Sequence, residues 1–136
     1  MMLVACALKP PGTFIKSFDE SGIWKTIEVR ENLDRDELWR LMVDTLTQKY
    51  DLEVVQKDSG YIRTSWKHTY VRNGAVIQNY RSRIVVKTVG EDWGKVQIKC
   101  ESNWLDNRQG WLLGYDTRLL ADAFSDIQGK IGRVVR

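Results

Sequence analysis

Apolar and polar residues alternate most regularly between Lys95 and Trp104, in the last third of the chain. One set of alternating positions is apolar or small, namely Val96, Ile98, Cys100, Ser102 and Trp104. The other set is charged or carries an amide, namely Lys95, Gln97, Lys99, Glu101 and Asn103. This period of two predicts a β-strand with one covered and one solvent-facing side, as in an antiparallel sheet.

Weaker alternation predicts further strands upstream. They are expected at residues 23–30, at 52–56, from 62 towards 71, and at 76–89. Between the last two, Asn73-Gly74 is the pattern of a short hairpin turn, because both residues accept the positive φ that such a turn requires.

Two segments carry apolar residues at helical spacing. In the first, Asp34 and Glu37 are placed to cap a helix. Its apolar stripe follows at Leu38, Leu41, Met42, Thr45 and Leu46, with Trp39 off the stripe. The second helix is expected to start at Asp116 or Thr117, and its stripe is Leu120, Ala123, Phe124, Ile127 and Ile131. The order β-α-β-β-β-β-α predicts one α+β domain over residues 23–136, a curved antiparallel sheet with both helices on one face.

The N-terminal residues have a different character. Leu3-Val4-Ala5-Cys6 has the form of a bacterial lipobox, so residues 1–6 are expected to be the remainder of a signal peptide ending at a lipid-anchored Cys6. Residues 7–22 contain Lys9-Pro10-Pro11-Gly12, which predicts an extended tether. The charged and apolar regions of a signal peptide would then lie upstream of Met1. The alternative is a chance match in a cytoplasmic protein that starts at Met1.

Composition narrows the class of protein only in part. Hydrophobic residues make up 43% and charged residues 29%, as in soluble globular domains. The net charge of +3 is too small to indicate a dedicated nucleic-acid-binding protein. No apolar run approaches the roughly 18 residues of a membrane-spanning helix. Cys100 alternates with Val96 and Ile98, so a buried thiol is expected there.

No combination of residues nominates an active site. His68 is the one histidine of the sequence, and no cysteine or carboxylate stands at metal-ligand spacing from it. No glycine-rich loop follows a strand. Asp34, Asp36 and Glu37 are better explained as charges at a helix N-terminus. The sequence therefore predicts a non-enzymatic protein without a catalytic residue, metal or cofactor.

Two surfaces are candidates for binding. The polar side of the sheet would collect basic residues into an anion-binding face, at Arg63, Lys67, Arg81, Arg83, Lys87 and Lys99. The alternative is a solvated face that keeps the sheet soluble. Nucleic acid is disfavoured as a ligand, because only Tyr61 shares the phase of Arg63 and Lys67 and base stacking needs interleaved aromatic rings.

The second surface is the segment 104–115, expected to be a loop. Its large apolar residues are candidates for binding a protein partner, at Trp104, Leu105, Trp111, Leu112 and Leu113. The alternative is that they close the end of the core.

The middle of the chain resembles the helix-grip domains of the BamC family. The similarity rests on Asp36-Glu37-Leu38-Trp39, Leu52-Glu53-Val54-Val55, Gly60-Tyr61-Ile62-Arg63-Thr64-Ser65-Trp66 and Tyr80-Arg81-Ser82-Arg83-Ile84-Val85-Val86. BamC is a lipoprotein subunit of the outer-membrane β-barrel assembly machinery. The resemblance therefore implies a helix-grip fold, a lipid anchor that Cys6 would match, an outer-membrane location and a protein partner. The family has two such domains and a long partner-binding N-terminal segment, whereas one domain and a short tether are predicted here.

Three functional hypotheses follow. The first is a non-enzymatic envelope lipoprotein on the periplasmic or outer surface, an accessory or scaffold subunit of an outer-membrane complex. The second is a carrier of a small molecule or lipid, which requires a cavity between the sheet and the C-terminal helix, beside Ile84, Val86, Ile98 and Phe124. The third is a cytosolic nucleic-acid-binding domain that acts through Arg81 and Arg83.

Overall fold

The structure is a computed structural model that describes residues 8–17 and 22–133. Its elements are β1 (Phe14–Lys16), β2 (Lys25–Glu28), α1 (Arg35–Thr47), β3 (Leu52–Gln56), β4 (Tyr61–Thr64), β5 (Val71–Arg72), β6 (Ala75–Val76), β7 (Tyr80–Val89), β8 (Lys95–Asp106), β9 (Gly110–Asp116) and α2 (Thr117–Ile131). Within this part of the chain, no helix has the length and apolarity of a membrane span. Cys6 lies outside the described residues.

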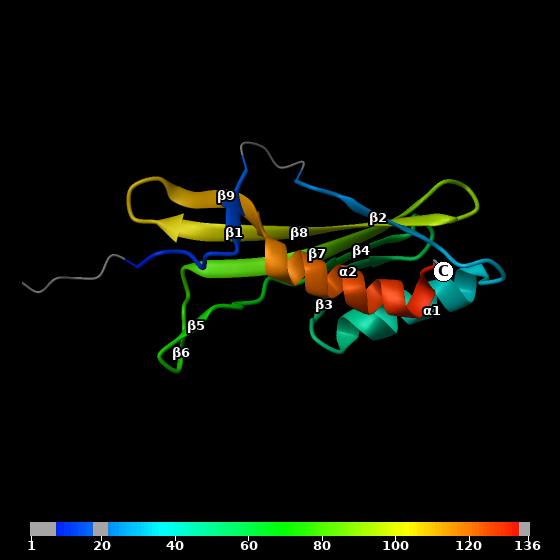
Figure 1. Ribbon diagram of the computed structural model, residues 1–136, viewed down its shortest axis with the longest axis horizontal. Coiled ribbons are helices and arrows are strands. Elements are labelled where there is room, and N and C mark those ends of the chain that lie inside the picture. The colour runs from blue at the N-terminus through cyan, green and yellow to red at the C-terminus, as the bar shows by residue number, and fades with distance from the viewer. Residues whose placement is uncertain (1–7, 18–21, 134–136) are drawn as a thin grey trace, which may run out of the picture.

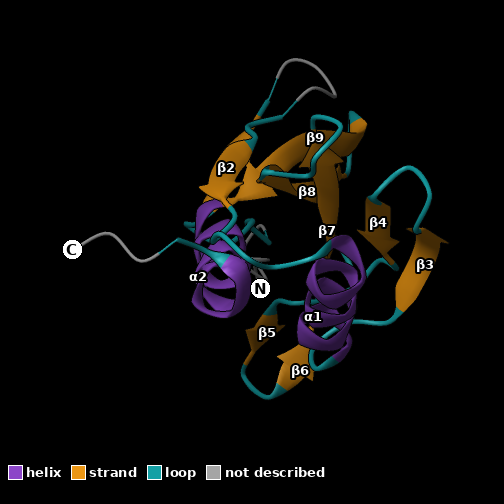
Figure 2. Cartoon of the chain, turned by 90° about the vertical axis from the view of Figure 1, so that its right-hand side faces the viewer, coloured by secondary structure: helices purple, strands orange, loops and turns teal. Residues whose placement is uncertain are grey.

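One curved antiparallel sheet forms the body of the protein (Figure 1). Its strand order is β1-β9-β8-β7-β4-β3, and β2 also pairs with β8. Seen along the sheet, the strands form an arc with α1 and α2 on its concave side (Figure 2). The predicted α+β architecture, a curved antiparallel sheet with two helices on one face, is therefore confirmed.

The core lies between the concave face of the sheet and the helices. In β8 the predicted inward set is buried throughout, and β7 supplies its cross-strand partners, with Ile84 opposite Cys100 and Val86 opposite Ile98. α1 begins where expected, because the Asp34 carboxylate accepts a hydrogen bond from the Glu37 N–H at 2.8 Å. Of the predicted apolar stripe, Leu38, Met42 and Leu46 are buried, and Leu41 is partly buried against the same core.

One residue of α1 departs from the expected pattern. Trp39, predicted to lie off the apolar stripe, is buried. The turn after β7 carries Trp93 at a φ of 56°, and its ring lies 6.3 Å from that of Trp39. Trp93 in this turn therefore packs against a face of α1 outside the predicted apolar stripe, and the core includes that face.

α2 also follows the sequence closely. Asp116 is its N-cap, and its carboxylate accepts hydrogen bonds from the N–H groups of Arg118 and Leu119. Leu120, Ala123, Ile127 and Ile131 are buried as predicted, and Phe124 is partly buried against the same core.

Two strands occupy segments that were expected to be irregular. β9 lies in the predicted loop and continues the sheet from β8 through a turn, in which the Asp106 carboxylate accepts hydrogen bonds from two main-chain N–H groups. β1 lies in the predicted tether and pairs with β9, with Phe14 packed edge-on against Tyr80 at 5.7 Å. Part of the predicted tether is therefore built into the domain.

The predicted Asn73-Gly74 turn is present, but its strands are short. Asn73 and Gly74 have φ values of 52° and 78° and join β5 to β6. These strands form a separate two-stranded sheet instead of extending β4 and β7. The hairpin projects from the body of the protein (Figure 1).

Candidate functional site

Five of the six predicted anion-binding residues lie together on the sheet face turned away from the helices, here called the outer face. Arg81, Arg83 and Lys87 alternate with buried residues along β7, Lys99 does so on β8, and Arg63 does so on β4. Across the strands, Arg63 of β4 and Lys99 of β8 both lie opposite Val85 of β7, which is buried between them.

The side chain of Lys67 lies apart from this group, although its main chain pairs with Ser82 of β7. It follows the end of β4, where its ammonium donates to the Lys49 carbonyl oxygen at 2.7 Å and lies 5.2 Å from the centre of the Tyr50 ring. The alternation that placed Lys67 with Arg63 ends at Thr64, because β4 ends there.

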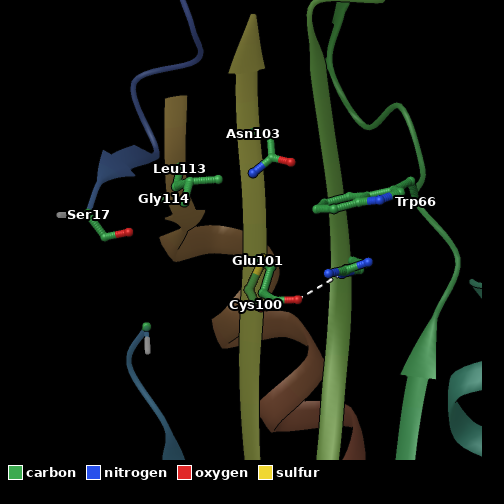
Figure 3. Close-up of a pocket in the computed structure, with 9 residues that line it drawn as sticks. Ser17, Trp66, Cys100, Glu101, Asn103, Leu113 and Gly114 are labelled. Carbon is green, nitrogen blue, oxygen red and sulfur yellow. Dashed lines mark hydrogen bonds and ion pairs between the residues drawn. The ribbon is translucent and has the colours of Figure 1, made fainter. Parts of the chain in front are cut away.

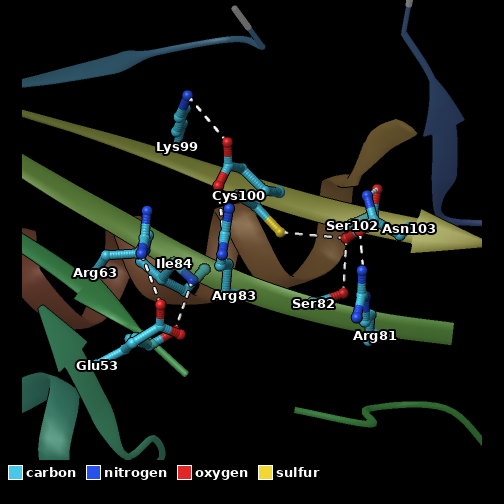
Figure 4. Close-up of polar contacts among 12 residues, drawn as sticks. Glu53, Arg63, Arg81, Ser82, Arg83, Ile84, Lys99, Cys100, Ser102 and Asn103 are labelled. Atoms are coloured by element: carbon cyan, nitrogen blue, oxygen red, sulfur yellow. Dashed lines mark hydrogen bonds and ion pairs between the residues drawn. The ribbon is translucent and has the colours of Figure 1, made fainter. Parts of the chain in front are cut away.

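Carboxylates neutralise part of the charge on the outer face. Arg63 forms an ion pair with Glu53, with an N–O distance of 2.6 Å. Glu101 forms ion pairs with Arg83 and Lys99, with N–O distances of 2.7 and 3.2 Å (Figure 4). Burial by itself would raise the pKa of Glu101, but the hydrogen bond from Arg83 and the two positive charges outweigh it and lower that pKa. Glu101 is therefore a fixed negative charge within a basic surface.

Tryptophan rings are interleaved with the basic side chains. The Arg81 guanidinium lies 4.3 Å from the centre of the Trp66 ring and 4.2 Å from that of Trp111. Arg83 lies 4.1 Å from the same Trp66 ring. We call Trp111, Arg81, Trp66 and Arg83 the Trp–Arg stack. Cation–π contacts of this kind contribute about 0.5–1 kcal/mol each at exposed sites and more when desolvated.

A similar contact continues along the outer face. The ammonium groups of Lys87 and Lys99 lie 4.2 and 4.8 Å from the centre of the Trp24 ring. Sequence reasoning missed this interleaving because Trp24, Trp66 and Trp111 come from outside β7 and β8. Alternation within a strand indicates which of its residues share a face. It does not indicate which aromatic rings of other segments pack against that face.

The predicted partner-binding residues divide between the two faces of the sheet. Trp104 is 4% exposed and contacts Tyr80 inside the domain, which agrees with the alternative that these residues close the core. Leu105 and Leu112 are partly buried. Trp111 and Leu113 are 39% and 38% exposed, on the outer-face side of β9. We call these two residues the β9 patch.

A shallow pocket lies beside the stack. β2 pairs with the start of β8 and β9 with its end, so residues 99–101 lie between the two partners. The pocket there measures about 250 Å³ (Figure 3). It is lined by Ser17, Gly22, Trp66, Arg83, Cys100, Glu101, Asn103, Leu113 and Gly114. Glu101 and Asn103 project from β8 between Trp66 and Leu113, so the lining combines charge, amide and apolar surface.

The inner face has a row of buried polar groups near the start of α2. The Tyr80 hydroxyl donates to Asp116 at 2.7 Å, and the Ser82 and Ser102 hydroxyls lie 2.6 Å apart. The Cys100 sulfur lies 3.5 Å from the Ser102 hydroxyl, and burial raises the pKa of its thiol to about 11. Cys100 is therefore buried, as the sequence predicts, and its thiol is protonated near neutral pH.

The region that a carrier would need for its ligand is filled. Ile84, Val86 and Ile98 are fully buried in one hydrophobic cluster with residues of both helices. The pocket on the outer face includes none of these side chains.

The one histidine of the sequence, His68, is bound to the main chain of β7. The Nδ1–H of His68 donates to the Tyr80 carbonyl oxygen at 2.9 Å, next to the β5–β6 hairpin. Among the described residues, no group of three histidine, cysteine or acidic side chains is placed to hold a metal ion.

No protein-family model matches the chain, and no curated protein sequence matches it significantly.

Proposed function

We propose that the protein is a non-enzymatic envelope lipoprotein that serves as an accessory or scaffold subunit of an outer-membrane complex, as its BamC-like sequence pattern implies. In this proposal Cys6 carries the lipid, and the outer face binds a protein partner. The observation that most supports docking is the exposure of Trp111 and Leu113 on one strand, where Trp111 also belongs to the Trp–Arg stack.

The composition of this surface supports protein binding. Tryptophan and arginine are the residues most enriched among those that dominate binding energy at protein interfaces. Here both occur in a defined geometry, because the Arg81 guanidinium contacts the Trp111 ring and is held by a second ring on Trp66. A rigid aromatic side chain costs little conformational entropy when a partner covers it.

The position of β1 limits how far the domain can lie from a lipid on Cys6. Eight peptide units separate Cys6 from Phe14, the first residue of β1, and at about 3.5 Å each they reach about 28 Å at most. This reach is comparable to the thickness of a bilayer core. A partner of the outer face would therefore be a membrane protein or another protein at the membrane surface.

The lipid anchor is tested by Cys6→Ser in the gene with its natural upstream sequence. We expect the protein to move from the membrane fraction to the soluble fraction, because the acylated thiol is lost and a single domain without its lipid has no other anchor in this proposal. Fractionation followed by immunoblotting measures the shift. Cys100→Ser is the matched control and should leave the protein in the membrane fraction. Retention of Cys6→Ser at the membrane would contradict the anchor.

The docking surface is tested by combining Trp111→Ala with Leu113→Ser in the anchored protein. In native gels of detergent-solubilised membranes, we expect the wild type to migrate in a large complex and the double variant to migrate alone. Val71→Ser with Val76→Ser is the matched control, because these two valines are also exposed but lie on the β5–β6 hairpin. Unchanged migration of the Trp111/Leu113 variant would count against docking through the β9 patch.

A further inference from the structure

Arg81 differs from the neighbouring arginines of the outer face, because no carboxylate of the described residues pairs with it. Arg63 is paired with Glu53 and Arg83 with Glu101. Arg81 contacts Trp66, Trp111 and Asn103, and within the described residues it forms no ion pair. Burial, together with repulsion from Arg83, lowers the pKa of its guanidinium. An arginine nevertheless keeps its charge at neutral pH.

The contacts of Arg81 hold its guanidinium in one orientation and leave its terminal N–H groups as the donors for a ligand. A ring packs against the guanidinium from Trp66 and another from Trp111, and its Nε–H donates to the Asn103 side-chain oxygen at 3.2 Å. The terminal N–H groups donate to no acceptor among the described residues. Two such groups in one plane match the two oxygens of a carboxylate, and the stacking has already removed much of the side chain's rotamer freedom.

The surroundings of Arg81 favour a single carboxylate over a polyanion. Glu53 and Glu101 already pair with Arg63, Arg83 and Lys99 on the same face, which weakens the attraction of these cations for a chain of phosphates. Cross-strand register places Arg81, Asn103 and Leu113 in one row on β7, β8 and β9. At the usual strand spacing the two ends of this row are about 10 Å apart. A ligand that spans the row would place a carboxylate at one end and an apolar group at the other.

We propose that Arg81, held between Trp66 and Trp111, recognises an aspartate or glutamate side chain of a partner protein, while an apolar side chain of the same segment covers Trp111 and Leu113. This inference rests on the proposed docking function and names the chemistry that the partner would present. Asn103 positions the guanidinium through the Nε–H.

The test is a selection of short random peptides displayed on phage against the purified domain. We expect selected peptides to be enriched in an acidic residue near an aromatic or aliphatic one. For a selected peptide, Arg81→Gln should weaken binding by about tenfold or more, the usual effect of losing a charge-assisted hydrogen bond. Arg63→Gln, the matched control on the same face, should leave affinity within about threefold, because Arg63 is already paired with Glu53.

A double-mutant cycle separates direct recognition from a general loss of charge. Replacing the acidic residue of the peptide by its amide should weaken binding as much as Arg81→Gln does, and the two changes together should cause little further loss. Arg81→Lys should bind several-fold more weakly than the wild type, because it keeps the charge but not the planar pair of donors. Thermal unfolding of each variant confirms that the domain is still folded.

The inference is rejected if no peptide is selected, if acidic residues are not enriched, or if Arg81→Gln binds the selected peptides normally. It is also rejected if an oligo-dT strand or vesicles containing phosphatidylglycerol bind more tightly than the peptides and compete with them, because the face would then be a polyanion site. If the Trp111/Leu113 variant leaves the membrane complex while Arg81→Gln remains in it, docking stands and carboxylate recognition fails.

Discussion

Replacing Asp116 with alanine is expected to destabilise the domain by about 2–4 kcal/mol. Two losses combine. The carboxylate caps α2 by accepting hydrogen bonds from Arg118 and Leu119 at 3.0 and 3.1 Å. It also accepts a hydrogen bond from the buried hydroxyl of Tyr80, which would lose this charged acceptor. Asp116 itself is 4% exposed, so water cannot easily replace it.

Asp34→Ala is the matched control, because Asp34 is also an N-cap but lies on the surface and contacts no buried hydroxyl. Its loss should cost about 1 kcal/mol, the usual value for a helix cap. Asp116→Asn should lie between the two, since its amide keeps one acceptor oxygen. Urea unfolding followed by circular dichroism gives the three free energies of unfolding. Equal effects of the two alanine substitutions would show that the Tyr80 contact contributes nothing.

Asp116 illustrates what a sequence can and cannot reveal. The cap is local, because the carboxylate and the N–H groups it binds are within three residues, and both helix starts were predicted from such patterns. The contact with Tyr80 is not local, since 36 residues separate the partners and no periodicity links them. Burial raises the pKa of the Tyr80 hydroxyl far above its usual value, and the hydrogen bond to Asp116 contributes to the rise.

The same distinction explains the strands. Most of β8 follows the predicted pattern, because apolar or small residues alternate with polar ones from Lys95 to Trp104. β9 was missed because Trp111, Leu112 and Leu113 are consecutive apolar residues that hide any alternation. They are nonetheless divided by the pleat, and only Trp111 and Leu113 of the three are exposed. β1 was missed because a strand of three residues carries almost no pattern of its own.

The candidate site shows where a pattern-based prediction stops. Alternation correctly gathered Arg81, Arg83, Lys87, Lys99 and Arg63 on one face. It could not show that Arg63 and Arg83 are paired with Glu53 and Glu101, nor that Arg81 has no carboxylate partner in the part of the chain that the structure describes. Those differences depend on strand register and on rings contributed by other segments. Three cations of this face are therefore paired with carboxylates, whereas Arg81 is held between two rings beside two exposed apolar side chains.

Gly114→Ala is expected to destabilise the domain by about 2 kcal/mol and to detach β1 from the sheet. A methyl group at this position would lie 2.6 Å from Cε1 of Phe14 and closer still to the carbonyl oxygen of Ile15. The main chain of β1 cannot yield while it stays paired with β9, where Lys16 lies opposite Gly114. Moving β1 away would also withdraw the Phe14 ring from Tyr80. Hydrogen exchange of the amides in β1, measured with the free energy of unfolding, reports both effects.

Gly129→Ala provides a control with the opposite expected sign. Gly129 lies within α2, and a methyl group there would have no neighbouring atom within 4 Å. Alanine should therefore stabilise the helix by about 0.5–1 kcal/mol, because it loses less backbone entropy than glycine on folding. If Gly114→Ala instead kept normal stability and normal protection of β1, the strand would not be packed against β9. Under the proposed function, the link from Cys6 to the domain would then extend beyond Phe14, and the proposed partner would be allowed to lie farther from the membrane.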